Sequence, residues 1–178
     1  MALNILKRLF DRSEGREALL PLYHAVVAEA RQPVWYAEAH VPDTREGRLE
    51  MVSAILALVL IRLEALGDEA KRPAVYLTEV FVDDMDGQLR EDGVGDVVVG
   101  KHIGKMMSAL GGRLSAYSES FVDRDVDAAL EAALLRNLYR GQTPTAAALA
   151  LASGRMRWLH GHLATRNLAA LLKGALAT

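Results

Sequence analysis

The chain has 178 residues, of which 51% are hydrophobic and 25% charged, and its formal net charge is −2. This composition excludes a disordered chain and is enough for one domain, or for one domain with an appended tail. The chain has no cysteine, which excludes a disulfide framework, a thiolate metal site and a cysteine nucleophile.

Charge is distributed unevenly along the sequence. Residues 132–178 contain six basic residues and no acidic one, whereas the first 131 contain the other 15 basic and all 23 acidic residues. Such a division favours a basic C-terminal segment that docks on the acidic body or on an anionic partner. The segment is also rich in alanine, which favours a helix.

The N-terminal residues 1–12 predict a short basic amphipathic helix, because Leu3, Leu6 and Phe10 share one face. Two interpretations are open: the helix touches a membrane surface, or it docks on the rest of the protein. The segment lacks the apolar centre and cleavage site of a signal peptide. The longest apolar run, residues 51–61, is shorter than the roughly 20 residues that cross a bilayer as a helix.

Helical patterns then dominate the chain. They predict helices over residues 17–31, from 43 to 66, from 73 to 92, over 96–121 and over 126–139, and a last one that begins at Thr143-Pro144. Asp43 and Asp96 are the expected N-caps, and Gly93 is expected to be left-handed. Residues 33–43 predict an irregular loop.

No convincing strand is present, so the predicted fold class is all-α, a single compact bundle of six or seven helices. We expect N-terminal helices over residues 1–32 and a core domain over 33–141. The basic, alanine-rich C-terminal helix of residues 142–178 is expected to pack on or beside this core.

Gly95, Gly100 and Lys101 have the spacing of a phosphate-binding P-loop, G-x-x-x-x-G-K. A working P-loop needs a buried strand before it and a serine or threonine after the lysine to ligate magnesium. Here the preceding residues 88–92 are charged and helical, and His102 follows the lysine. The glycines are better explained as a turn between two helices, after which Lys101 and Lys105 form a basic stripe.

Other candidate sites for metals or catalysis also lack residues or a geometry that the site would require. The sequence DDMDG at 83–87 resembles part of a calcium loop, but Val82 and Gly93 occupy the two main ligand positions. His160 and His162 are two residues apart, so a helix would point them nearly opposite ways. We therefore expect no metal site, no catalytic residue and no cofactor, haem included.

Several short motifs follow one another between residues 35 and 140. They are Trp35-Tyr36, VPDT (41–44), GRLEM (47–51), FVDDMD (81–86), LREDGVGD (89–96), VGK (99–101), Lys105-Met106, Gly112-Arg113 and Tyr117. This order resembles the ubiquinol–cytochrome c chaperone family, and LREDGVGD followed by VGK is its most specific part. The part of the basic segment beyond residue 141 is not covered by these motifs.

The resemblance implies an all-helical, non-enzymatic assembly chaperone. It implies that the chain binds newly made cytochrome b and assists biogenesis of the ubiquinol–cytochrome c reductase, respiratory complex III. A small second chaperone subunit and the ribosome are further partners that it implies. Since the chain lacks a mitochondrial targeting segment, we expect a bacterial cytoplasmic protein that is peripheral at the inner membrane.

A chaperone of this kind needs an apolar patch with a charged rim. Trp35, Tyr36 and Phe81, with Met85, are the expected apolar patch, unless they belong to the core. The acidic members of the site are expected to be Glu50, Asp83, Asp84 and Asp86. These side chains would meet basic segments of the client, unless they are solvated or paired inside the protein. The expected basic members of the site are Arg48, Arg90, Lys101 and Lys105.

An alternative function starts from the basic C-terminal segment. It would make the protein a helical module that binds the ribosome or a nucleic acid through phosphate contacts. We expect no sequence-specific recognition of nucleic acid.

Overall fold

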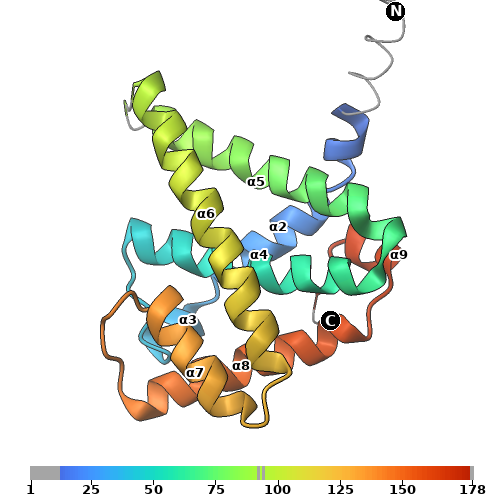
Figure 1. Ribbon diagram of the computed structural model, residues 1–178. Coiled ribbons are helices and arrows are strands. Elements are labelled where there is room, and N and C mark those ends of the chain that lie inside the picture. Colours follow the sequence, from blue (N-terminus) through green and yellow to red (C-terminus); the bar gives the residue numbers. More distant parts are fainter. Residues whose placement is uncertain (1–12, 92, 94, 177–178) are drawn as a thin grey trace, which may run out of the picture.

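A computed structural model describes residues 13–91, 93 and 95–176. The predicted N-terminal helix of residues 1–12 lies outside the described residues. A helical turn at 13–17 precedes the labelled elements (Figure 1), which are α2 (Leu20–Ala30), α3 (Pro33–Ala37), α4 (Arg45–Leu66), the 3-10 turn η1 (Asp68–Ala70), α5 (Lys71–Glu91), α6 (Asp96–Phe121), α7 (Val126–Asn137), α8 (Ala146–Ala164) and α9 (Leu168–Leu172). No strand occurs among these residues, which confirms the all-α class.

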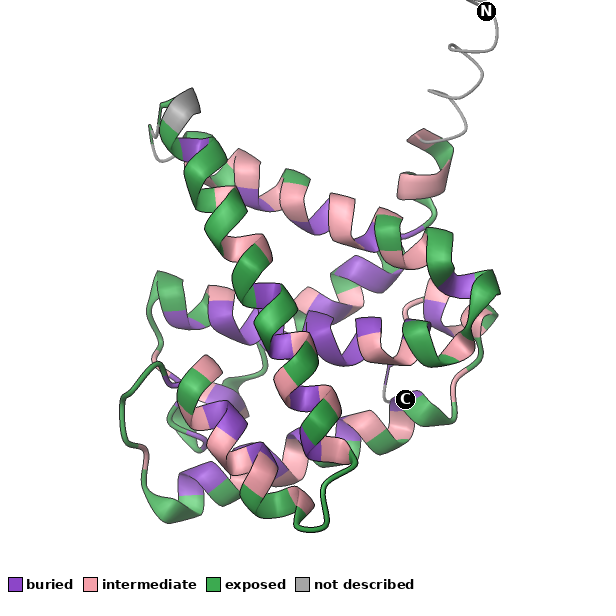
Figure 2. Cartoon of the chain, viewed as in Figure 1, coloured by how far each residue is buried: buried purple, intermediate pink, exposed green. Residues whose placement is uncertain are grey.

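Helix α4 is the centre of the bundle and packs against α2, α5, α6 and α8. Every residue from Met51 to Leu60 is buried, so this part of the helix is covered on all sides (Figure 2). A helix that is apolar all round belongs in an interior, since each buried leucine or isoleucine stabilises the fold by about 1.5–3 kcal/mol relative to an exposed one.

The remaining helices cover α4. Helices α5 and α6 are joined by a turn at Gly93, whose φ of 76° is the left-handed conformation that the sequence predicted. They diverge from this turn in Figure 1, and α6 continues to α7, against which it packs. Helix α8 lies against α4 and α7, while α9 contacts α2.

Three local predictions are wrong. Residues 33–37 form the short helix α3 and not a loop, because Pro33 suits the first turn of a helix. The N-cap of α4 is Thr44, whose hydroxyl accepts a hydrogen bond from the Gly47 N–H at 3.0 Å, so Asp43 lies outside the helix. Gly95 is the N-cap of α6, and Asp96 is its first residue.

Arginines of the basic C-terminal segment contact the body of the protein. Arg155 pairs with Glu29 of α2 at 3.2 Å, and Arg157 pairs with Asp127 of α7. Arg62 of α4 donates two hydrogen bonds to the Arg166 carbonyl oxygen, at 2.6 and 3.0 Å. Polar contacts thus add to the apolar packing that holds α8 and the following turn on the bundle.

Candidate functional site

The acidic side chains of α5 already have partners inside the protein. Asp83 pairs with Arg16 at 2.8 Å, and Asp86 pairs with Arg90 one turn further along the helix at 2.6 Å. Asp84 accepts a hydrogen bond of 2.6 Å from the Tyr23 hydroxyl. Internal pairing, one of the alternatives considered for these acids, is therefore confirmed.

The expected apolar patch is wrong for three of its four members, since Met85, at 7% exposed, also belongs to the core. Trp35 and Phe81 are 0% exposed and belong to the core. The Trp35 indole N–H donates to the Glu29 carbonyl oxygen at 2.9 Å, and the Arg155 guanidinium lies 5.0 Å from the centre of its ring. Tyr36 is half-buried and donates from its hydroxyl to the Ala30 carbonyl at 2.7 Å.

Glu50 is also buried and does not face a partner surface. It forms an ion pair with Arg113 of α6, and Arg140 approaches its other carboxylate oxygen at 3.3 Å. Arg113 is 5% exposed, and this burial lowers the pKa of its guanidinium. The motif residues Glu50 and Arg113 are thus joined across the core, which the sequence did not indicate.

The basic members of the expected site belong to three different helices, α4, α5 and α6. Arg48 pairs with Asp43 at 2.6 Å on the surface, and Arg90 is held by Asp86. Lys101 and Lys105 are exposed one turn apart on α6, as predicted. Gly100 and Lys101 lie within the first turns of α6 and follow a helix, so the P-loop interpretation is excluded.

No metal site is found among the described residues, since no group of three or more histidine or acidic side chains is placed to hold an ion. The rings of His160 and His162 are apart from each other, as predicted. His160 stacks on Phe121 with 3.8 Å between ring centres, and His162 contacts Trp158.

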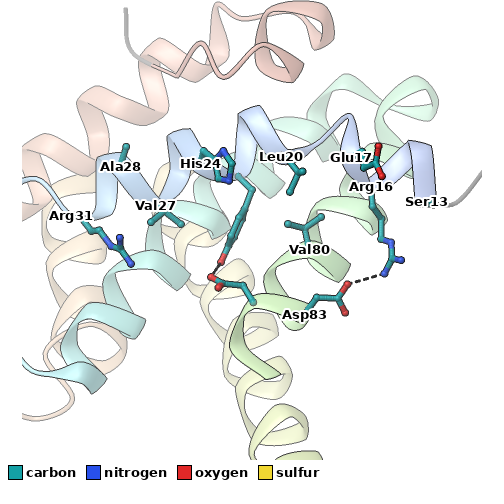
Figure 3. A pocket seen from close by; sticks show the side chains of 12 residues that line it. Ser13, Arg16, Glu17, Leu20, His24, Val27, Ala28, Arg31, Val80 and Asp83 are labelled. Atoms are coloured by element: carbon teal, nitrogen blue, oxygen red, sulfur yellow. Dashed lines mark hydrogen bonds and ion pairs between the residues drawn. The ribbon is translucent and has the colours of Figure 1, made fainter. Parts of the chain in front are cut away.

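A groove of about 670 Å³ lies between α2 and α5, and the sequence predicted only its acidic wall. Leu20 and Val80 point into it in Figure 3, and Leu20 is 39% exposed. Arg16 and Asp83 pair at one end, while Arg31 lies at the other.

A second pocket, of about 400 Å³, adjoins this groove and is lined by residues of α2, α4, α5 and α6. Val27, Arg31 and Asp84 line both, so the two hollows are continuous around Arg31. Its apolar walls include Leu49 of α4 and Met106 of α6. No sequence pattern indicated that these side chains surround a hollow.

Comparisons with known proteins agree with this architecture. The family model described as ubiquinol–cytochrome c chaperone matches residues 37–178, so the match extends through the basic segment that the sequence motifs left uncovered. None of the curated proteins matches the chain. A crystal structure of the Cbp3 homolog from Brucella abortus is similar over 99% of this chain and 96% of that one, with a TM-score of 0.78 and 31% sequence identity. The chain therefore belongs to the ubiquinol–cytochrome c chaperone family and is an assembly chaperone of respiratory complex III.

Proposed function

We propose that this chaperone binds newly made cytochrome b, the membrane subunit of complex III, and that the groove between α2 and α5 is its docking surface. The observation that carries the proposal is the composition of the groove. Leu20, which is 39% exposed, offers apolar surface inside it, and its three acids, Glu17, Asp83 and Asp84, outnumber its two arginines, Arg16 and Arg31. An apolar client segment with basic flanks complements such a surface.

The pairing of the acids does not remove them from this role. Asp83 and Arg16 are an exposed pair, with 63% and 38% of their side chains accessible. An exposed ion pair of this kind contributes about 0–1 kcal/mol, so a basic client residue can displace Arg16 at small cost. Asp84 is partly buried and bonded to Tyr23, so we assign it a structural role in the wall.

Crosslinking from single positions tests the docking surface. A photoreactive amino acid at Leu20, inside the groove, is compared with one at Val75, which is 55% exposed on α5 and does not line the groove. We expect capture of cytochrome b from position 20 and not from position 75. Equal capture from both, or capture only from position 75, would place the client elsewhere.

We infer that the protein acts by binding and not by catalysis, and that it works at the membrane where cytochrome b is inserted. No described helix has both the length and the apolar composition to cross a membrane. Membrane contact in this proposal is peripheral. A flotation assay with and without cytochrome b distinguishes contact through the client from direct lipid contact.

The alternative, ribosome or nucleic-acid binding through the C-terminal segment, is weakened by its pairing with the body. Three of its arginines pair with acids of the body or core: Arg140 with Glu50, Arg155 with Glu29 and Arg157 with Asp127. Deleting the segment would uncover the core, so charge removal is the better test. Lys173→Gln combined with Arg136→Gln should leave ribosome association unchanged, and a loss would revive the alternative.

A further inference from the structure

One end of the groove between α2 and α5 is formed by the first residues that the structure describes. Ser13, Arg16 and Glu17 line this end, and Leu20 follows further in (Figure 3). Residues 1–12 are therefore joined by a peptide bond to the wall of the groove. Such a tether gives a segment an effective concentration of the order of millimolar at a site within its reach, so a contact with a Kd of about 1 mM half-fills that site.

The composition of residues 1–12 complements the groove. Leu3, Leu6 and Phe10 recur at helical spacing, and three basic residues against one acidic residue give the segment a charge of +2. In the lining of the groove, three acids outnumber two arginines. One of these acids, Glu17, is exposed and has neither an ion pair nor a hydrogen bond within the described part of the chain. Its carboxylate is therefore available to a basic residue of the segment.

The spacing of apolar and charged residues agrees in the two partners when the segment runs antiparallel to α2. Leu3 and Lys7 are four residues apart in the segment, which the sequence predicts as a helix. Glu17 and Leu20 are three residues apart in the lining of the groove, and Leu20 is 39% exposed. Each separation is about one helical turn. A segment that turns back and places Leu3 on Leu20 therefore brings a lysine to an acid that has no other partner.

The length of the segment is enough for this return. Leu20 is seven residues from Ser13, roughly 10 Å along a helix. A reversal of about four residues leaves about eight, which span roughly 12 Å as a helix and about 26 Å when extended. We propose that residues 1–12 fold back into the groove between α2 and α5, with Leu3 against Leu20, and that a client must displace them. The displacement rests on the proposed function of the groove, whereas the fold-back does not.

Disulfide trapping tests the fold-back in the full chain, which has no cysteine of its own. The variant Leu3→Cys/Leu20→Cys is compared with Leu3→Cys/Val75→Cys, with diamide as the oxidant. Val75 is 55% exposed and does not line the groove, and the ring of the adjacent Tyr76 lies against Gly15, so the control position is also close to the start of the described chain. We expect the disulfide within one chain to form at least about fivefold faster in the first variant, because docking raises the local thiol concentration.

Two acids separate attraction to the groove from an effect of overall charge. Glu17→Gln removes the acid in the groove, and Glu14→Gln removes an exposed acid three residues away that does not line it. In the Leu3→Cys/Leu20→Cys background, the first change should slow trapping about threefold at low salt, and the second should leave it unchanged. Leu6→Asp should also slow trapping, since it places a charge on the apolar face of the segment.

Several results would overturn the fold-back. One is equal trapping at positions 20 and 75, which would show that the segment does not prefer the groove. A disulfide between two chains would give the groove to the segment of a second copy. Equal trapping together with flotation on anionic phospholipid vesicles, abolished by Leu6→Asp, would assign the segment to a membrane surface.

Capture of the client separates this inference from the proposed function. If the segment half-fills the groove, Leu6→Asp should increase crosslinking of cytochrome b from a photoreactive residue at Leu20 about twofold. Capture that this change leaves unaltered would overturn the displacement. Preferential trapping at Leu20 without any capture of cytochrome b would support the fold-back and contradict the proposed function.

Discussion

Glu50 of α4 and Arg113 of α6 form an ion pair inside the core, with only 8% and 5% of each residue exposed. Arg113 also donates to the Asn137 carbonyl at the end of α7, at 3.2 Å. One arginine thus ties three helices together at a point where apolar packing alone would not fix their register. Two separate sequence motifs meet in this contact.

Removing one partner of this pair should be strongly destabilising. Arg113→Met leaves the Glu50 carboxylate buried with only the more distant Arg140, and we expect a loss of about 3 kcal/mol in the free energy of unfolding. Urea denaturation followed by circular dichroism measures this loss. The double variant Glu50→Gln/Arg113→Met should be more stable than the sum of the two single losses predicts, and strict additivity would show that the pair is not coupled.

Stability should fall at alkaline pH because four tyrosines are kept neutral. Burial raises the pKa of Tyr139 to about 12, and burial also raises the pKa values of Tyr23, Tyr36 and Tyr117. Above the ordinary pKa of 10.0 the unfolded tyrosines lose protons that the folded ones keep, so the unfolded state is favoured as pH rises from 10 towards 12. Denaturant unfolding between pH 8 and 11 (about 10 being the expected break) measures the slope.

Tyr117 provides the control for this alkaline effect. Its hydroxyl is fully buried and has no hydrogen-bond partner among the described residues. Tyr117→Phe should therefore be at least as stable as the natural chain at neutral pH, and its stability should fall less steeply above pH about 10. An unchanged slope would mean that this tyrosine does not contribute.

Acid should weaken the protein partly through His160. Half-burial of this ring against Phe121 lowers its pKa below 6.5. The unfolded state then binds the proton first, so the stability that neutral His160 contributes is present above pH 6.5 and is lost as pH falls through the lower, folded-state pKa. His160→Phe keeps the stacking without the titration, and its thermal unfolding should depend less on pH between about 7 and 5.

Two glycines should respond to alanine in opposite directions. A Cβ at Gly47 would collide with the Pro42 carbonyl oxygen, which belongs to the backbone and cannot swing aside, so Gly47→Ala should destabilise by about 1–3 kcal/mol. A Cβ at Gly104 meets nothing within 4 Å. Because alanine favours a helix, Gly104→Ala should stabilise by about 1 kcal/mol. Comparing the two melting temperatures checks both.

The sequence predicted most of the helices because their apolar spacing and end signals are local. It failed at Trp35, whose neighbouring prolines indicated a loop, because the same Pro33 can begin a helix when a buried tryptophan holds it. It also could not tell a buried acid from an exposed one. Glu50 and Asp83 have the same charge, and only the positions of Arg113 and Arg16 in space separate their roles.

The candidate hollows were the least predictable feature. Each depends on side chains from helices far apart in sequence, such as Leu20 with Val80, and on the angle at which those helices cross. A pattern along one helix shows which face is apolar. It does not show whether a neighbouring helix covers that face completely, as at Met51, or leaves part of it open, as at Leu20.

The fully buried centre of α4 has a consequence for the synthesis of the protein on the ribosome. During synthesis, the apolar residues 51–61 leave the ribosome 85 positions before Ala146, the first residue of the helix that covers one of their sides. At about 5–20 residues per second this interval lasts roughly 4–17 s. During that time the nascent chaperone exposes an apolar segment that its own C-terminal helix will later cover. The nascent chain is therefore at risk of aggregation in the same way as the membrane proteins that chaperones bind.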